Sequence, residues 1–194
     1  GVPSPKVWRK YLEYQKNKYG DIKNISFRNK DHGWSLYQMK ISFKSKIYCK
    51  CYKDDSFMNV FLDDLCLRDS CYNCIFKKKY RNSDITLADF WGIDKVKNKY
   101  NDDKGVSAVI INTKKGENIF EKIKKYCNYE KVELNDIIKY NSAYVQSSKL
   151  NKNRELFFKD INNMKFNRLA KKYIKKPSLL KKIVRKVYKK LKIK

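Results

Sequence analysis

The chain has 194 residues, of which 42% are hydrophobic, enough for a core in one globular body with an appendage. Lys and Arg number 47 against 20 acidic residues, and the net charge of +27 favours anionic partners such as nucleic acid, phospholipid headgroups or phosphate-bearing cofactors. No run approaches the roughly 20 apolar residues that span a bilayer, and no apolar signal sequence is present, so we expect a soluble cytoplasmic protein with reduced cysteines.

The beginning of the sequence predicts one helix and then a small antiparallel sheet. Ser4 and Pro5 are typical of a helix start and Gly20 of a stop, so we expect a helix over residues 5–19 that packs through aromatic side chains. The following β-rich segments predict strands at 22–28, 34–43 and 47–52, joined by turns at 29–33 and 44–46. His32 is the only histidine, and we interpret it as a surface residue of the first turn.

The middle of the sequence predicts helices between strands. Asp54 and Asp55 can cap a helix that runs through Leu65. Strands are expected at about 84–90 and 106–111. Thr113 can cap a helix that runs to about Cys127, and we expect this helix to bury Ile119, Phe120, Ile123 and Cys127. The succession of strand, helix and strand ends near Val132. The predicted fold class is α+β (or α/β), with a mixed sheet and flanking helices in a domain of residues 1–145.

The last segment, residues 146–194, predicts a basic helical C-terminal tail. It carries 18 basic and 2 acidic residues. We expect a loop over 142–153, a helix over 154–175, and an amphipathic basic helix over 179–191. Such a tail can cover a partner or lie against an anionic membrane surface. Because Lys heavily outnumbers Arg, the specific reading of nucleic-acid bases gets little support.

The spacing of Cys71 and Cys74 is the strongest chemical signal. Two thiolates separated by two residues can bind one soft metal centre, and the same spacing occurs in zinc sites, iron–sulfur sites and redox dithiols. A closed site needs four ligands, which Cys49, Cys51 and Cys66 can complete. The alternative function is therefore a zinc-stabilised basic module that binds nucleic acid or an anionic surface. Cys49 and Cys51 alternate on a predicted strand, which fits two packed thiols equally well.

Acidic residues surround the Phe90–Trp91 pair. Asp84, Asp89 and Asp94 lie in an arrangement typical of the lip of a cofactor site at a strand edge, although a core tryptophan with turn-capping aspartates gives the same spacing. The turn at 104–107 offers backbone amides to a phosphate or simply begins a strand. There is no Gly-rich phosphate loop, and no nucleophile motif accompanies His32, so a hydrolytic triad is not expected.

An ordered succession of short motifs runs through the first 116 residues. It consists of Gly1-Val2-Pro3-Ser4-Pro5-Lys6-Val7-Trp8, Phe27-Arg28 with Gly33-Trp34, Leu67-Arg68-Asp69-Ser70-Cys71-Tyr72-Asn73-Cys74 with Ser83-Asp84-Ile85-Thr86, and Lys104-Gly105-Val106-Ser107 with Asn112-Thr113-Lys114-Lys115-Gly116. This succession resembles the carboxy-terminal domain of the coenzyme F-420 hydrogenase/dehydrogenase beta-subunit family, over roughly residues 1–160.

The resemblance implies an iron–sulfur flavoprotein oxidoreductase subunit. In such a subunit electrons pass between a 4Fe-4S cluster, FAD and a soluble hydride acceptor, with an electron-donor or acceptor protein as partner. Cys71 and Cys74 match the family's cysteine pair and are implied cluster ligands. The resemblance places the following residues near the flavin, without assigning a catalytic residue: Ser83, Asp84, Thr86, Asp89, Gly92, Gly105 and Ser107.

The sequence also departs from the family pattern. Family members usually carry an amino-terminal region with ferredoxin-like cysteine motifs, and a cysteine shortly before the Gly-Val-Pro-Ser-Pro segment. This sequence begins after that point, so we expect it to be part of a longer chain and inactive alone, with both cofactors completed by the preceding region. Ala88 stands where glycine is common, and Asp69 replaces an expected proline. A scaffold without a cofactor is the third alternative.

Overall fold

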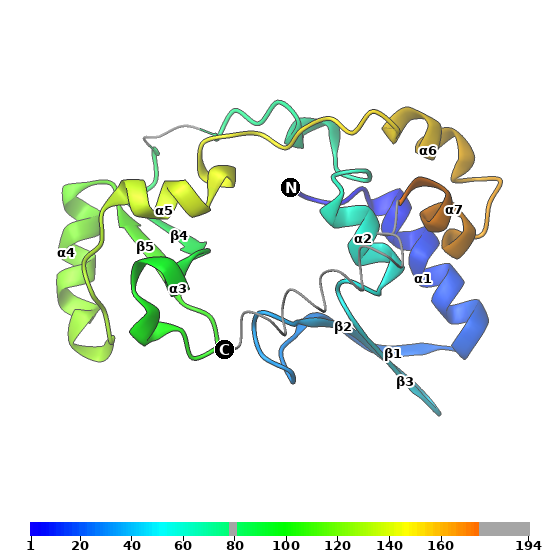
Figure 1. Cartoon of the computed structure of the whole chain (residues 1–194), viewed down its shortest axis with the longest axis horizontal. Coiled ribbons are helices and arrows are strands. Elements are labelled where there is room, and N and C mark those ends of the chain that lie inside the picture. The colour runs from blue at the N-terminus through cyan, green and yellow to red at the C-terminus, as the bar shows by residue number, and fades with distance from the viewer. Residues whose placement is uncertain (78–80, 175–194) are drawn as a thin grey trace, which may run out of the picture.

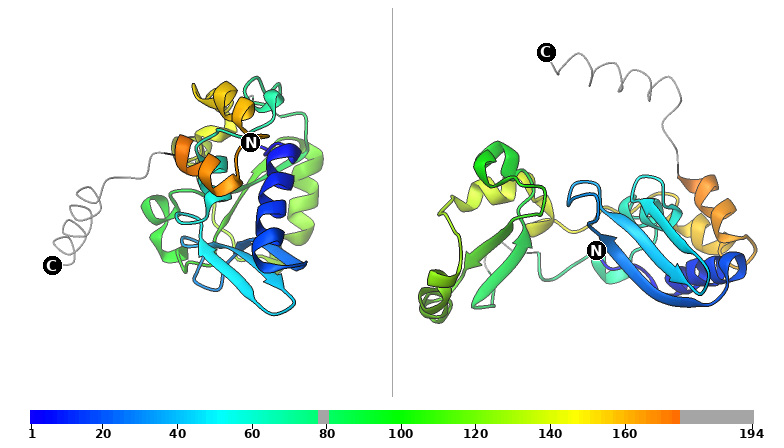
Figure 2. Two further views of the ribbon diagram at one scale, coloured as in Figure 1. Left: turned by 90° about the vertical axis from the view of Figure 1, so that its right-hand side faces the viewer. Right: turned by 90° about the horizontal axis from the view of Figure 1, so that it is seen from below.

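The computed structural model describes residues 1–77 and 81–174, which form two lobes (Figures 1 and 2). The elements of the first lobe are α1 (Pro5–Tyr19), β1 (Ile22–Asn29), β2 (Gln38–Phe43), β3 (Ile47–Cys51), α2 (Ser56–Leu62), α6 (Arg154–Asp160) and α7 (Phe166–Tyr173). Those of the second lobe are β4 (Ile85–Asp89), α3 (Ile93–Val96), β5 (Ser107–Ile111), α4 (Lys114–Ile123) and α5 (Leu134–Tyr140). The predicted α+β class is confirmed. Within the described ranges, no helix is long and apolar enough to cross a membrane.

Helix α1 begins and ends where the sequence predicts. Pro5 occupies its first turn, and Gly20 ends it in a backbone conformation with φ of 89° that favours glycine. Ser4 occupies the N-cap position, but its hydroxyl makes no capping hydrogen bond. Instead the Ser4 amide donates to the Cys66 carbonyl at 2.7 Å, which ties the helix start to the segment after α2.

The three predicted strands near the amino terminus form an antiparallel sheet in the order β1-β2-β3. One face is buried against helices of the first lobe, and it carries the alternating side chains of Tyr37, Met39, Ile41 and Phe43. Strand β2 begins at Gln38 and not at Trp34. The reason is that the Trp34 amide donates to the Asp103 carbonyl at 2.6 Å, so this part of the loop pairs with the second lobe and not with the sheet.

Aromatic rings fill the centre of the first lobe. The Phe57 ring on α2 lies 4.7 Å from the Trp8 ring, 5.2 Å from Tyr11 and 5.7 Å from Phe27, measured between ring centroids. As predicted, Asp55 caps α2, since its carboxylate accepts from the Met58 amide at 2.8 Å. The helix ends at Leu62, short of the predicted Leu65, and Asp64 then turns the chain with φ of 54°.

The predicted helix over 154–175 is two helices, α6 and α7. The break at 161–165 contains two asparagines, and Lys165 is extended. Both helices bury apolar side chains in the core of the first lobe, among them Phe157, Ile161, Phe166 and Leu169. The division of the chain at 145/146 stays a prediction, and the amphipathic helix expected over 179–191 lies outside the described residues.

The second lobe is built on a separate two-stranded sheet, in which β4 and β5 pair antiparallel. The expected strands thus divide between two antiparallel sheets. No third strand forms near Val132 within the described ranges, so that prediction is wrong. Helix α4 ends at Ile123, and Ile119, Ile123 and Cys127 are exposed, against the burial predicted for them. The core of this lobe consists instead of Phe90, Ile93, Ala108 and Ile137, which belong to other elements.

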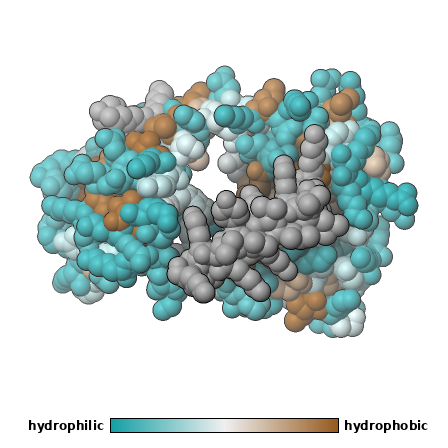
Figure 3. Space-filling model, in the orientation of Figure 1, coloured by the Kyte–Doolittle hydropathy of each residue, from teal (hydrophilic) through white to brown (hydrophobic). Residues whose placement is uncertain are grey.

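The end of β1 and the loop between β1 and β2 contact the second lobe. Arg28 forms an ion pair with Asp89 at 3.1 Å, and the Trp34 ring lies 4.4 Å from the Trp91 ring. The Ser35 amide donates to the Asp103 carboxylate at 2.8 Å. These contacts hold the end of β4 opposite the first lobe, and the space-filling view shows the molecule hollowed between the lobes (Figure 3).

Candidate functional site

A cavity of about 280 Å³ lies along β4, the strand of its sheet nearer the first lobe (Figure 1). Its walls come from β4, from Trp91 shortly after this strand, and from the two segments that connect the lobes. The lining residues are Lys77, Arg81, Thr86, Leu87, Ala88, Asp89, Trp91, Asn141, Ala143 and Tyr144. The volume is near the lower end of the roughly 300–1,000 Å³ typical of ligand pockets.

The open edge of β4 forms one wall of this cavity. Thr86 and Ala88 stand opposite Ile110 and Ala108, and their backbone groups face β5. In an antiparallel ladder the alternate residues turn their amides and carbonyls the other way. The Asp89 carbonyl agrees with this pattern, because it accepts a hydrogen bond from the Asn141 side chain at 3.1 Å. The amide and carbonyl of Leu87 therefore point from β4 toward the cavity side.

Two cations stand beside this edge. Lys77 donates to the Ala143 carbonyl, and Arg81 donates to the Tyr144 carbonyl at 2.5 Å. The Arg81 guanidinium also lies over the Tyr144 ring, 4.6 Å from its centroid. Its Nε atom is buried and has no hydrogen-bond partner among the described residues. The guanidinium of this half-buried residue is thus incompletely satisfied, and an anionic group is the partner that such a guanidinium favours.

Four of the seven residues placed near the flavin by resemblance lie on or beside β4. Thr86 and Asp89 line the cavity. Ser83 supports Thr86, with their hydroxyl oxygens 3.1 Å apart, and Asn112 donates to Thr86 at 2.9 Å. Asp84 does not line the cavity; it accepts from Thr113 at 2.6 Å and pairs with Lys115, and these two contacts lower the pKa of its carboxyl.

The other three residues lie outside the cavity lining. Ser107 stands opposite Asp89 at the end of β5. Gly92 has φ of 80° and Gly105 has φ of 94°. A Cβ at Gly92 would approach the Tyr140 ring to 2.2 Å, and one at Gly105 would approach the Trp34 ring to 2.6 Å. Both glycines are therefore required by local packing, whatever else they do.

Four lining residues, Arg81, Lys77, Asn141 and Tyr144, are not indicated by the sequence as site residues. Tyr144 lies in the loop predicted over 142–153 and Asn141 directly precedes it, and no motif marks any of the four. Trp91 belongs to the acidic segment that the sequence does indicate, and it is 39% exposed at the cavity, in contact with Trp34. An exposed tryptophan next to charged loop residues is the one available signal.

Cys71 and Cys74 are half-buried where the chain leaves the first lobe. The Val2 amide donates to Sγ of Cys71 at 3.1 Å. The Cys74 amide donates to the Ser147 hydroxyl at 2.9 Å, and the Cys71 carbonyl accepts from the Ser148 amide at 3.2 Å. The pair is therefore held between the first residues of the chain and the second connecting segment, and neither thiol is sealed in the core.

The described residues do not assemble the four-cysteine site that the zinc alternative requires. No group of three or more metal-binding side chains gathers within 1–77 and 81–174. Cys49 and Cys51 lie on β3 opposite Lys40 and Gln38, and the Cys49 thiol donates to the Gln38 side chain at 3.0 Å. Cys66 is fully buried, and burial raises the pKa of its thiol to about 12. His32 lies in an exposed turn, as predicted.

Comparison with known proteins assigns the chain to a family. No curated protein and no solved structure matches it. The family model for the C terminus of the beta subunit of coenzyme F420 hydrogenase/dehydrogenase matches residues 1–137, which is more than half of the chain. The match contains α1, both sheets and the cysteine pair. The chain therefore belongs to the family defined by the C terminus of the coenzyme F420 hydrogenase/dehydrogenase beta subunit.

Proposed function

We propose that this chain is the part of an oxidoreductase subunit that holds a flavin along β4 and contributes Cys71 and Cys74 to a 4Fe-4S cluster. Membership of the family supports the oxidoreductase class. The observation that carries the proposal is the cavity at the open edge of β4. Its lining includes two polar residues of β4, two cations and an exposed tryptophan: Thr86, Asp89, Lys77, Arg81 and Trp91.

The residue types in the cavity fit parts of FAD. Lys77 and Arg81 suit the diphosphate, since charged donors bind phosphate oxygens and the Arg81 Nε lacks a partner among the described residues. Trp91 offers an exposed ring face for an aromatic system. The amide and carbonyl of Leu87 match the alternating acceptors and donor of a flavin's pyrimidine edge. The volume accommodates one part of the dinucleotide, with the remainder in the hollow between the lobes.

The surroundings of Cys71 fit a cluster ligand. A thiolate that accepts an amide hydrogen bond is stabilised, and such bonds tune cluster potentials. Any residues that precede Gly1 in a longer polypeptide emerge beside Cys71, because Val2 contacts its sulfur. The upstream cysteine that relatives carry would therefore approach the same place and add a third ligand to the pair.

FAD, when bound, exchanges two electrons or a hydride, and a 4Fe-4S cluster carries single electrons. The chain's own residues position these groups: Arg28 holds Asp89 through an ion pair, and Asn112 holds Thr86. The two cysteines lie on the segment that leads to Arg81, so cluster and flavin would share one stretch of chain. The expected partner is a redox protein, and we place the protein in the cytoplasm. Binding of the basic tail to an anionic surface remains a prediction.

The flavin proposal is tested by titrating FAD into the polypeptide that contains this chain and following flavin fluorescence. Replacing Arg81→Gln removes the charge and should weaken FAD binding about tenfold or more, the range of a charged hydrogen bond. Arg9→Gln, on the exposed face of α1, removes the same charge far from β4 and should leave the affinity unchanged. Equal affinities for all three proteins would reject the cavity as the flavin site.

A further inference from the structure

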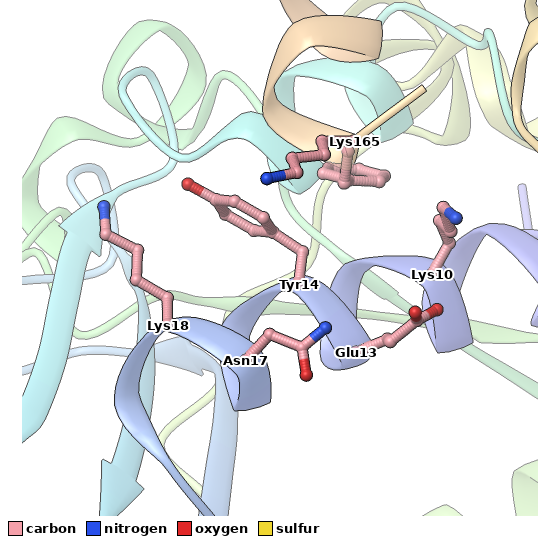
Figure 4. A pocket seen from close by; sticks show the side chains of 7 residues that line it. Lys10, Glu13, Tyr14, Asn17, Lys18 and Lys165 are labelled. Carbon is pink, nitrogen blue, oxygen red and sulfur yellow. The ribbon is translucent and has the colours of Figure 1, made fainter. Parts of the chain in front are cut away.

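A second cavity lies in the first lobe, away from β4 and the cysteine pair. It holds about 300 Å³ and is formed by α1 and the start of α7 (Figure 4). Its lining residues are Lys10, Glu13, Tyr14, Asn17, Lys18, Lys165 and Phe166. Neither the family membership nor the proposed flavin site involves this groove.

The groove has a fixed wall. Phe166, the first residue of α7, is fully buried and its ring meets the Tyr11 ring of α1 edge-on at 5.2 Å. This contact fixes the start of α7 against α1 and places Lys165, the residue before the helix, over the groove. The position of the Lys165 backbone is therefore set by the core and not by a surface loop.

The charges at one end of the groove are unbalanced. Many lysines of the chain pair with a carboxylate, but Lys18 and Lys165, at this end of the groove, form no ion pair within the described ranges. Figure 4 shows the Tyr14 hydroxyl reaching between the amines of Lys18 and Lys165. Helix α7 also begins without a side-chain cap, so its positive end adds to the field there. The amines of Lys18 and Lys165 and the Tyr14 hydroxyl thus lie at the same end of the groove, where the Lys18 amine also lies over the Tyr19 ring, 5.1 Å from its centroid.

The other end of the groove has the opposite character. Glu13 and Asn17 are four positions apart on α1, so they share a face and present acceptors to the groove. Lys10 lies beside Glu13 at this end (Figure 4). A second anionic group would meet the Glu13 carboxylate, which disfavours polyanions such as nucleic acid, whereas hydroxyl groups can donate to both acceptors.

We propose that this groove binds a phosphomonoester whose remainder is neutral and hydroxylated. The phosphate lies among Lys18, Lys165 and the Tyr14 hydroxyl, because ammonium groups act as compact point charges toward phosphate. The hydroxyls of the ligand donate to Glu13 and Asn17, and Phe166 forms an apolar wall. The same chemistry occurs in soluble polyol phosphates and in lipid phosphomonoesters that keep a free hydroxyl, such as lysophosphatidic acid.

The test uses glycerol 3-phosphate and inorganic phosphate as soluble probes, titrated calorimetrically into the full chain at constant ionic strength. The double variant Lys18→Gln, Lys165→Gln should lower the affinity for glycerol 3-phosphate by about tenfold or more. The control Lys23→Gln, Lys44→Gln removes the same charge from exposed positions outside the groove and should change the affinity less than about twofold. Tyr14→Phe should give a smaller loss than the lysine variant.

A parallel arm measures binding to phosphatidylcholine vesicles with and without lysophosphatidic acid, a phosphomonoester whose glycerol keeps one free hydroxyl. Binding that depends on Lys18 and Lys165 in the vesicle arm alone assigns a lipid headgroup, and dependence in the soluble arm assigns a free phosphomonoester. Equal losses in the groove variant and the control would show unspecific attraction to a chain of charge +27 and overturn the proposal. Absence of binding in both arms would overturn it as well. Thermal unfolding of each variant checks that the fold is intact.

Discussion

The backbone amide of Val2 donates a hydrogen bond to Sγ of Cys71 across 3.1 Å, although 69 positions separate the two residues. The Pro3–Leu67 bridge and the bond from the Arg68 amide to the Val2 carbonyl hold the same two segments together. The first residues of the chain are thus fixed beside the cysteine pair, which is where the proposed cluster would gather ligands from two parts of one polypeptide.

The cysteines should differ sharply in their reactivity. Burial raises the pKa of the Cys66 thiol to about 12, so at pH 8 it remains a protonated thiol inside the core. Cys71 and Cys74 are accessible in part. Alkylation with iodoacetamide under native, reducing conditions, followed by mass spectrometry, should label Cys71 and Cys74 and spare Cys66. After unfolding, Cys66 should react like the others; native labelling of Cys66 would contradict its placement.

Replacing Asp55 should destabilise the first lobe strongly. Its buried carboxylate accepts from the hydroxyls of Tyr11 and Tyr48, each at 2.7 Å, and caps α2 through the Met58 amide. Burial, followed by the charge of Asp55, raises the pKa of both tyrosines, so they stay donors. Asp55→Ala leaves these donors buried without an acceptor and should lower the free energy of unfolding by about 3 kcal/mol or more, measured in urea.

Asp54→Ala is the matched control for that change. Asp54 is exposed beside Asp55, so its replacement should stay within about 0.5 kcal/mol of the parent. If the two variants unfold alike, Asp55 does not organise the core.

A methyl group at Gly105 should disturb the contact between the lobes. Gly105 and Gly20 both have positive φ, 94° and 89°. A Cβ at Gly20 meets nothing within 4 Å, whereas one at Gly105 meets the Trp34 ring at 2.6 Å. Gly20→Ala should therefore cost about 1–3 kcal/mol of backbone strain, and Gly105→Ala should cost clearly more. Tryptophan fluorescence should shift in the Gly105 variant alone, since Trp34 packs on Trp91.

The carboxyl of Glu130 should titrate far below its usual range. Hydrogen bonds from Lys97 and Lys99, each at 2.5 Å, lower its pKa from 4.5 to about 2. Because the folded pKa is depressed, the stabilisation is present above about pH 4.5 and is lost as the pH falls toward 2. Carboxyl NMR shifts should show this pKa, and Lys97→Gln with Lys99→Gln should return it toward 4.5. An unchanged pKa in that variant would contradict the contact.

Local signals predicted the first lobe well. Pro5 and Gly20 bound α1, and alternation from Tyr37 to Phe43 identified the buried face of β2, because these features depend on nearby residues. The predictions that were wrong concern features that depend on residues distant in the sequence. Trp34 lies outside β2 because its amide donates to the Asp103 carbonyl. Ile119 and Ile123 are exposed because the buried core of the second lobe is formed by residues outside α4, such as Phe90 and Ile137.

The candidate site was predictable in part. Thr86, Asp89 and Trp91 carry a pattern along one strand, whereas Arg81 and Asn141 reach the cavity from connecting segments that only the tertiary fold brings to β4. A loop arginine in a chain with 47 basic residues has no distinguishing mark in the sequence.

The most direct test of the cofactor assignment is anaerobic purification of the polypeptide that contains this chain, with iron, acid-labile sulfide and flavin measured on the same sample. We expect a coloured protein with all three, in which Cys71→Ser with Cys74→Ser loses iron and sulfide, and Cys49→Ser with Cys51→Ser retains them. A colourless protein that contains zinc, or neither metal nor flavin, would contradict the assignment.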